Sequence, residues 1–134
     1  VLGDVVVLAV WYGTNIEIAK QLGAKLAGKV VVDIANPLNS TYDGLATAPD
    51  SSSAEDLAKA IAAGAYVVKA FNTTFAGTLI AGEAGGQKLD VFIAGDDADM
   101  AVAQAGSIEP THGKFRRGII AVDACQCLGH LWIL

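Results

Sequence analysis

Four short apolar runs occur along the chain at the spacing that is typical of alternating strands and helices. They are rich in β-branched or aromatic residues and are mostly bounded by Gly, Asp or Asn. The runs are Val5–Val10, Val30–Ala35, Tyr66–Phe71 and Val91–Ala94. None alternates cleanly between polar and apolar positions. We therefore predict strands that are buried on both faces, as in a parallel sheet covered by helices.

A helical pattern follows the first run. Thr14 and Glu17 have the spacing of a capping box, which predicts that the helix begins there. An apolar residue then recurs at every fourth position until Gly28, which predicts the end of the helix. The recurring residues are Ile18, Leu22 and Leu26.

A second helical pattern lies between the second and third runs. Ser52 and Glu55 form another potential capping box, and Gly64 marks the expected end. The apolar stripe of this helix consists of Leu57, Ala58, Ile61 and Ala62. A weaker helix is predicted over 97–105, and the region 107–134 is the least periodic part of the chain.

The order of these elements predicts the fold class. Strands that alternate with helices at this spacing form βαβ units, whose right-handed crossovers give an α/β fold with a doubly wound, mostly parallel sheet. The 134 residues are enough for a single domain. The loop from Asn36 to Asp50 is long for a connection between a strand and a helix, and such loops often serve a ligand or a partner.

Composition narrows the classes of partner. The chain is 53% hydrophobic and only 17% charged, and its net charge is −5. An acidic chain is a poor partner for nucleic acid, whose binding depends on Lys and Arg. No apolar run is long enough to span a membrane, and no basic segment opens a signal peptide, so we expect a cytoplasmic protein.

The residues just after the strands are the first candidates for a ligand site, because open α/β sheets bind ligands at the carboxyl ends of their strands. These positions combine aromatic, amide, hydroxyl and glycine residues, which suit a flat heterocycle held by stacking and hydrogen bonds. They are 11–13, 36–39, 72–74 and 95–97. No reactive nucleophile with an adjacent base occurs among them. The alternative interpretation is that Asn, Gly and Pro gather there because turns require them.

Glycine loops that bind phosphate are missing from this sequence. A dinucleotide-binding fold carries GxGxxG after its first strand, yet no two of the 15 glycines here have the GxG spacing. Gly23 to Lys29 matches GxxxxGK, but Val30 replaces the Ser or Thr that binds magnesium. These glycines are also expected to end a helix and enter a strand, so we reject a P-loop.

Three other clusters are interpreted as structural. Two cysteines and two histidines near the C-terminus fit no standard zinc spacing, so we predict reduced, packed thiols and no metal site. Asp96 and Asp97 are expected to cap the next helix. A small basic cluster could meet a ligand phosphate, but a solvated turn is the simpler interpretation. The residues concerned are Cys125, Cys127, His112 and His130 in the first cluster, and Lys114, Arg116 and Arg117 in the last.

Four segments in register closely resemble the family of coenzyme F420-dependent NADP oxidoreductases. They are Asp4–Val10, Lys29–Pro37 with the sequence KVVVDIANP, Val67–Thr73 with VVKAFNT, and Asp90–Asp97 with DVFIAGDD. Order and spacing match from Asp4 to about Asp99. Residues 1–105 thus match well. Residues 106–134 match only weakly, at positions 108–110 and 115–117 and in the leucine-rich C-terminal end.

This resemblance implies a Rossmann-type fold in which NADP(H) and the deazaflavin F420 lie face to face and exchange a hydride directly. The cofactors carry the reactivity, so side chains mainly align them and no catalytic residue is expected. The family pattern places cofactor-binding residues at Val10, Trp11, Tyr12, Asn36, Pro37, Asn72, Thr73 and Thr74.

Two departures from the family qualify this expectation. Trp11 stands where members commonly have Pro before the aromatic residue, which enlarges that turn. The resemblance also leaves out the family's first half, which carries the glycine loop and the ribose-reading residues, so we expect the chain to correspond to the C-terminal half of the Rossmann domain. The strand Val5–Val10 would then expose an unpaired apolar edge, which predicts dimerisation or pairing with a completing chain.

Three hypotheses follow from the sequence. The chain is a truncated member of the hydride-transferring family that another chain must complete. Alternatively, it is a non-enzymatic module that pairs with a partner by strand addition at its exposed edge. The third hypothesis is an independent binder of a small ligand in the strand-end cleft.

Overall fold

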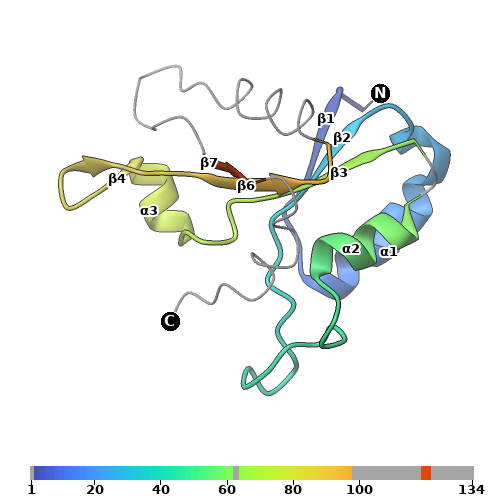
Figure 1. Cartoon of the computed structure of the whole chain (residues 1–134), viewed down its shortest axis with the longest axis horizontal. Helices are drawn as coiled ribbons and strands as arrows, with labels where there is room; N and C mark the ends of the chain where they lie inside the picture. Colours follow the sequence, from blue (N-terminus) through green and yellow to red (C-terminus); the bar gives the residue numbers. More distant parts are fainter. Residues whose placement is uncertain (1, 62–63, 98–118, 122–134) are drawn as a thin grey trace.

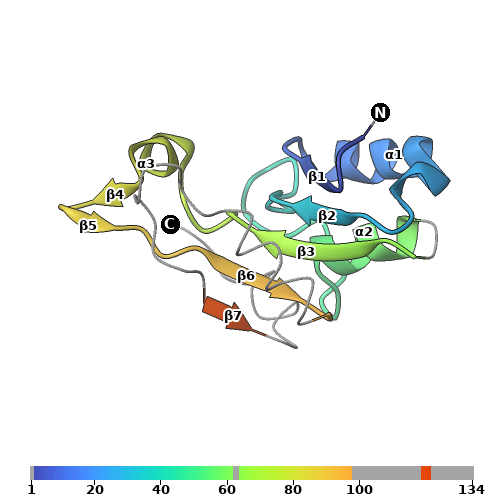
Figure 2. The same cartoon turned by 90° about the horizontal axis from the view of Figure 1, so that it is seen from above.

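The computed structural model describes residues 2–61, 64–97 and 119–121. Their central feature is a five-stranded sheet with the order β1-β2-β3-β6-β7 (Figure 2). The strands are β1 (Val5–Leu8), β2 (Val30–Asp33), β3 (Tyr66–Ala70), β6 (Phe92–Gly95) and β7 (Ile119–Ala121). The first four coincide with the four apolar runs, which confirms the predicted strands and the α/β class.

Three of the four strand pairings are parallel, and β3 with β6 is antiparallel. The sheet is therefore mostly parallel, as predicted. The connection from β3 to β6, for which the sequence analysis predicted no helix, is not a βαβ crossover. It consists of a short helix, α3 (Ala76–Ala81), and a hairpin of β4 (Glu83–Ala84) and β5 (Gln87–Lys88). These elements project beyond the sheet, away from α1 and α2 (Figures 1 and 2).

Two helices cover one face of the sheet. They are α1 (Tyr12–Leu22), which a short 3-10 turn (Gly23–Leu26) continues, and α2 (Ser53–Ala60), which lies beside α1 (Figure 1). The apolar core between the helices and the sheet consists of Leu8, Ala19, Leu26, Val31, Leu57 and Ile61. Because side chains alternate along a strand, the other face carries a separate cluster of Val30, Val32, Val68, Ala70, Val91 and Ile93.

The two predicted helix starts had different outcomes. Ser52 and Glu55 form the complete capping box, in which the Ser52 hydroxyl accepts from the Glu55 amide and the Glu55 carboxylate accepts from the Ser52 amide. The prediction at Thr14 was wrong, because α1 begins two residues earlier and its N-cap, Trp11, makes no side-chain capping bond. The helix begins shortly after β1, so Thr14 already lies in the first turn of α1 and cannot be its N-cap.

β1 lies at one edge of the sheet in the part of the chain that the structure describes. Val5 and Val7 are 36% and 50% exposed, whereas Val6 and Leu8 contribute to the core under α1 and α2. The strand therefore presents an apolar edge, as the sequence predicted, but the expectation that it is buried on both faces was wrong, because Val5 and Val7 are exposed.

Several predicted features lie outside the described residues. These are the helix over 97–105 beyond its first position, the cysteine and histidine cluster, and the basic cluster at 114–117. Among the described helices, none is long and apolar enough to cross a membrane.

The capping difference is testable. We expect Ser52→Ala to lower the free energy of unfolding by about 1 kcal/mol, because it removes the acceptor for the Glu55 amide. Thr14→Ala removes no cap and replaces Thr with a better helix former, so we expect no loss of stability. Urea denaturation of both variants measures the difference. An equal loss in the two variants would contradict the assigned start of α1.

Candidate functional site

A cleft of about 750 Å³ opens at the carboxyl ends of β1 and β2, which is the size of a typical cofactor pocket. Its walls come from the exit of β1, the first turn of α1, the segment after β2 and the start of α3. The lining residues are Ala9, Val10, Trp11, Thr14, Ile34, Ala35, Asn36, Leu38 and Ala76. Most of them are apolar, and Thr14 and Asn36 supply the polar side chains. Such a surface suits a flat ring that also carries hydrogen-bonding groups.

Three of the predicted site residues meet in this cleft. They are Val10 and Trp11 from the β1 exit and Asn36 from the segment after β2. Trp11 is 71% exposed, so its indole is available to a ligand. Gly13, in the first turn of α1, has no atom within 4 Å of the position that a Cβ would take, which leaves the approach to this turn open.

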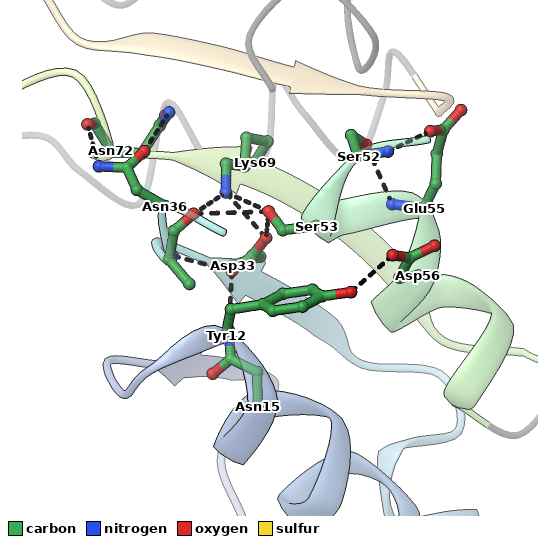
Figure 3. A network of polar contacts seen from close by, with 11 residues as sticks. Tyr12, Asn15, Asp33, Asn36, Ser52, Ser53, Glu55, Asp56, Lys69 and Asn72 are labelled. Atoms are coloured by element: carbon green, nitrogen blue, oxygen red, sulfur yellow. Dashed lines mark hydrogen bonds and ion pairs between the residues drawn. The ribbon is translucent and has the colours of Figure 1, made fainter. Parts of the chain in front are cut away.

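The other predicted residues do not line the cleft. Pro37 is buried, and its carbonyl accepts a hydrogen bond from Ala46 in the long loop. Thr73 and Thr74 are half-buried in the turn after β3. Tyr12 is directed toward α2, as Figure 3 shows.

Asn72 joins the cleft indirectly, through Asn36. The Asn36 side chain donates to the Asn72 carbonyl at 3.2 Å, and the Asn72 side chain donates to the Asn36 carboxamide oxygen at 3.3 Å. Phe71, between β3 and Asn72, has a φ of 63°, which is a strained conformation for a bulky residue and costs roughly 1–2 kcal/mol. This turn directs Asn72 back toward Asn36. The two amides thereby connect the ends of β2 and β3.

A buried charged network lies behind the cleft (Figure 3). Asp33 is fully buried and Lys69 is 1% exposed, and the Lys69 ammonium is 2.9 Å from the Asp33 carboxylate. Asn15 of α1 donates to the same carboxylate at 2.8 Å, and Ser53 of α2 donates to it at 2.6 Å. Lys69 also donates to the Ser53 hydroxyl at 2.6 Å and to the Ala35 carbonyl.

The sequence analysis did not assign a role to this network, although it contained a signal. Asp33 and Lys69 interrupt two otherwise apolar strands, and a charged residue is rarely buried unless it is paired. The parallel register of β2 and β3 places the two residues opposite each other. Two opposite charges at matching positions of neighbouring buried runs therefore predict such a pair.

A second polar cluster connects the two helices beside the site. The Tyr12 hydroxyl donates to Asp56 at 2.7 Å, and Ser51 donates to the other oxygen of that carboxylate at 2.6 Å. Burial, the hydrogen bond and the charges of Asp56 and Asp33 raise the pKa of Tyr12 to about 12. Burial opposes ionisation of Asp56, but hydrogen bonds from Ser51, Tyr12 and Lys59 outweigh it and lower its pKa. Tyr12 is therefore a neutral hydrogen-bond donor at physiological pH.

Two further candidates do not belong to the cleft. Residues 95–97 follow β6, which is antiparallel to β3 and therefore ends at the other edge of the sheet. Gly23 belongs to the 3-10 turn, and Gly28, with a φ of 73°, precedes β2, so the GxxxxGK segment ends a helix as expected. Within residues 2–61, 64–97 and 119–121, His, Cys, Asp and Glu form no group of three that could hold a metal ion.

Comparisons with known proteins point to one fold. No family model matches the chain, and no curated protein matches it. A protein from Arthrobacter sp. FB24, named as a candidate F420-dependent NADP reductase, is 28% identical over 95% of this chain, with a TM-score of 0.81. A hypothetical protein from Sinorhizobium meliloti is also 28% identical over 88% of this chain, with a TM-score of 0.74.

A more distant likeness supports the same architecture. A pyrroline-5-carboxylate reductase from Coxiella burnetii is 14% identical over 90% of this chain, with a TM-score of 0.50, and shows the fold alone. The chain covers 56%, 59% and 36% of the S. meliloti, Arthrobacter and Coxiella chains, respectively. It therefore shares a Rossmann-like fold with these proteins and spans little more than half the length of its two more similar neighbours.

The bond between Tyr12 and Asp56 gives a pH-dependent prediction. We expect Tyr12→Phe to lower the free energy of unfolding by about 1 kcal/mol at neutral pH. The pKa of Tyr12 is about 12 in the folded chain and about 10 when unfolded, so its contribution is lost as the pH rises from 10 to 12.

The stability difference between the wild type and Tyr12→Phe should therefore be constant from pH 7 to about pH 9 and should narrow above pH 10. Thermal unfolding of both proteins across this range measures it. A difference that stays constant up to pH 12 would contradict the bond.

Proposed function

We propose that this chain is part of an oxidoreductase that binds NADP(H) and the deazaflavin coenzyme F420 and supports hydride transfer between them. The observation that carries this proposal is the cleft at the ends of β1 and β2, in a fold shared with a candidate F420-dependent NADP reductase. Its volume and mixed lining fit a nicotinamide or a deazaflavin ring. Three of the four sequence segments that resemble this reductase family contain β1, β2 and β3, whose carboxyl ends lie on the side of the cleft. The fourth contains β6, which is antiparallel to β3 and runs the other way.

In this proposal the residues of the chain position rings and take no part in bond making. The exposed indole of Trp11 offers a stacking surface at the cleft wall. The carboxamide of Asn36, held by Asn72, offers a hydrogen-bonding group from the segment after β2. When bound, the two cofactors supply the hydride chemistry themselves, so alignment is the task that remains for the protein.

We further propose that the whole chain, residues 1–134, corresponds to the C-terminal half of a Rossmann domain, with residues 1–105 matching well and residues 106–134 only weakly. The supporting observations are the absence of GxG spacing in the sequence and the 56% and 59% coverage of the two more similar neighbours. A completing segment or chain would then supply the phosphate-binding loop and the choice between NADP and NAD.

A fluorescence titration of the chain with NADPH, with and without F420, tests the proposal. We expect saturable binding with a Kd near or below roughly 100 μM, which is about −5.5 kcal/mol. Trp11→Leu should weaken binding about fivefold to tenfold, because aromatic stacking contributes roughly 1 kcal/mol.

Tyr66→Leu is the matched control, because Tyr66 is an exposed aromatic residue at the opposite end of β3 from the strand-end cleft. We expect it to leave the affinity unchanged. No binding up to millimolar NADPH, alone or with F420, would reject the cofactor site in this chain.

A second candidate function is pairing through the edge of β1, as a homo-oligomer or with a completing chain. The supporting observation is the edge position of β1 with its half-exposed Val5 and Val7. An apolar strand edge offers unpaired backbone groups that another strand can use.

Light scattering coupled to size-exclusion chromatography tests this pairing. We expect a concentration-dependent dimer that Val7→Lys dissociates, because a charge on an edge strand disfavours pairing. Ile80→Lys is the control, since Ile80 is 83% exposed on α3, away from β1. A wild-type chain that stays monomeric at high concentration would count against self-pairing.

A further inference from the structure

Asp33 and Lys69 form an ion pair that is buried inside a small, otherwise apolar sheet. Both side chains are removed from water, and Asp33 and Lys69 lie opposite each other in the register of β2 and β3. Burying two charges costs desolvation energy that the ion pair often only offsets, and apolar residues of similar size are frequently as stabilising. Stability alone therefore does not account for the pair.

The contacts of the pair converge on Ala35, which lines the cleft. The Ala35 amide donates to the Asp33 carboxylate at 2.9 Å, and the Ala35 carbonyl accepts from the Lys69 ammonium. Both polar groups of this residue are thus held by the ion pair. The orientation of the peptide that leads into Asn36 is fixed as a consequence.

The same pair reaches both helices that cover the sheet. Asn15 of α1 and Ser53 of α2 each donate to Asp33, so the starts of the two helices are tied to the end of β2 (Figure 3). Thr14, the neighbour of Asn15, lines the cleft together with Ala35 and Asn36. A shift of the pair would therefore move two walls of the cleft at once.

We propose that Asp33 and Lys69 are positioning residues, which hold the segment from Ala35 to Leu38 in the conformation that receives the ligand. This inference rests on the proposed function for its ligand. It adds that binding depends on a charged pair that lies behind the cleft and is not among the residues that line it.

The test uses the double variant Asp33→Asn/Lys69→Met, which removes both charges and keeps the volumes and the acceptor for the Ala35 amide. We expect its thermal unfolding midpoint to stay within about 5 °C of the wild type. The bond from Lys69 to the Ala35 carbonyl is lost and only the longer contact from the Ser53 hydroxyl, at 3.4 Å, remains, so the segment should loosen.

Amide hydrogen exchange reports on the segment without any ligand. The amides of Ala35, Leu38 and Ala46 are hydrogen-bonded to Asp33, Asn36 and Pro37, respectively. In the double variant we expect these three amides to exchange at least about tenfold faster, while those of β2 and β3 are unchanged. Unchanged exchange at the three amides, or an equal increase throughout the chain, would overturn the positioning role.

A titration with NADPH then separates this inference from the proposed function. If the wild type binds NADPH, the double variant should bind about tenfold more weakly, and an unchanged affinity would overturn the inference. If the wild type does not bind, the proposed function fails, and the exchange experiment still decides whether the pair fixes the segment.

Two further variants complete the design. Lys59→Met is the matched control, because Lys59 forms an exposed ion pair with Asp56 and should affect neither exchange at Ala35 nor affinity. If the double variant does not fold, Ser53→Ala removes the contacts of the Ser53 hydroxyl with Asp33, Lys69 and the Ala35 carbonyl and keeps the ion pair. We expect it to accelerate exchange at Ala35 several-fold, and no acceleration would overturn the inference.

Discussion

The pairing of Asp33 with Lys69 across β2 and β3 is the contact on which the site depends. A charge inside a sheet is retained only where an opposite charge and further hydrogen bonds replace the water that it loses. Here Asn15, Ser53 and the backbone of Ala35 supply those bonds. The requirement couples the register of the two strands to the position of both covering helices, because each partner comes from a different element.

The strand-end cleft follows from this coupling. β1 leads directly into α1 without a side-chain cap, and β2 leads into a long segment whose first residues are held by the ion pair. Phe71 adopts a left-handed conformation after β3 and brings Asn72 to Asn36. The outcome is a mainly apolar cleft with an exposed indole and an amide pair, a combination that suits flat aromatic cofactors.

The strands and α2 were predictable because their signals are local. A β-branched apolar run between turn residues has few alternatives to a buried strand, and the Ser52–Glu55 box satisfies backbone donors within one helical turn. The start of α1 was not predictable from Thr14 and Glu17, since the exit geometry of β1 determined it. The β4–β5 hairpin had a local signal, because Gly85-Gly86 is a typical hairpin turn and both residues have a positive φ. The antiparallel direction of β6 was not predictable from that turn, since it depends on how β6 pairs with β3.

The sequence by itself determined the fold class and the positions of four strands, and it directed the search for site residues to the ends of those strands. Only the tertiary structure decided which of them meet. Val10, Trp11 and Asn36 line the cleft, whereas Tyr12 turns toward Asp56 and Asn72 acts through Asn36. Secondary structure depends on neighbours along the chain, but contacts between strand ends depend on register, helix start and backbone strain. Those are set by residues such as Asp33 and Lys69, which are distant in sequence and adjacent in space.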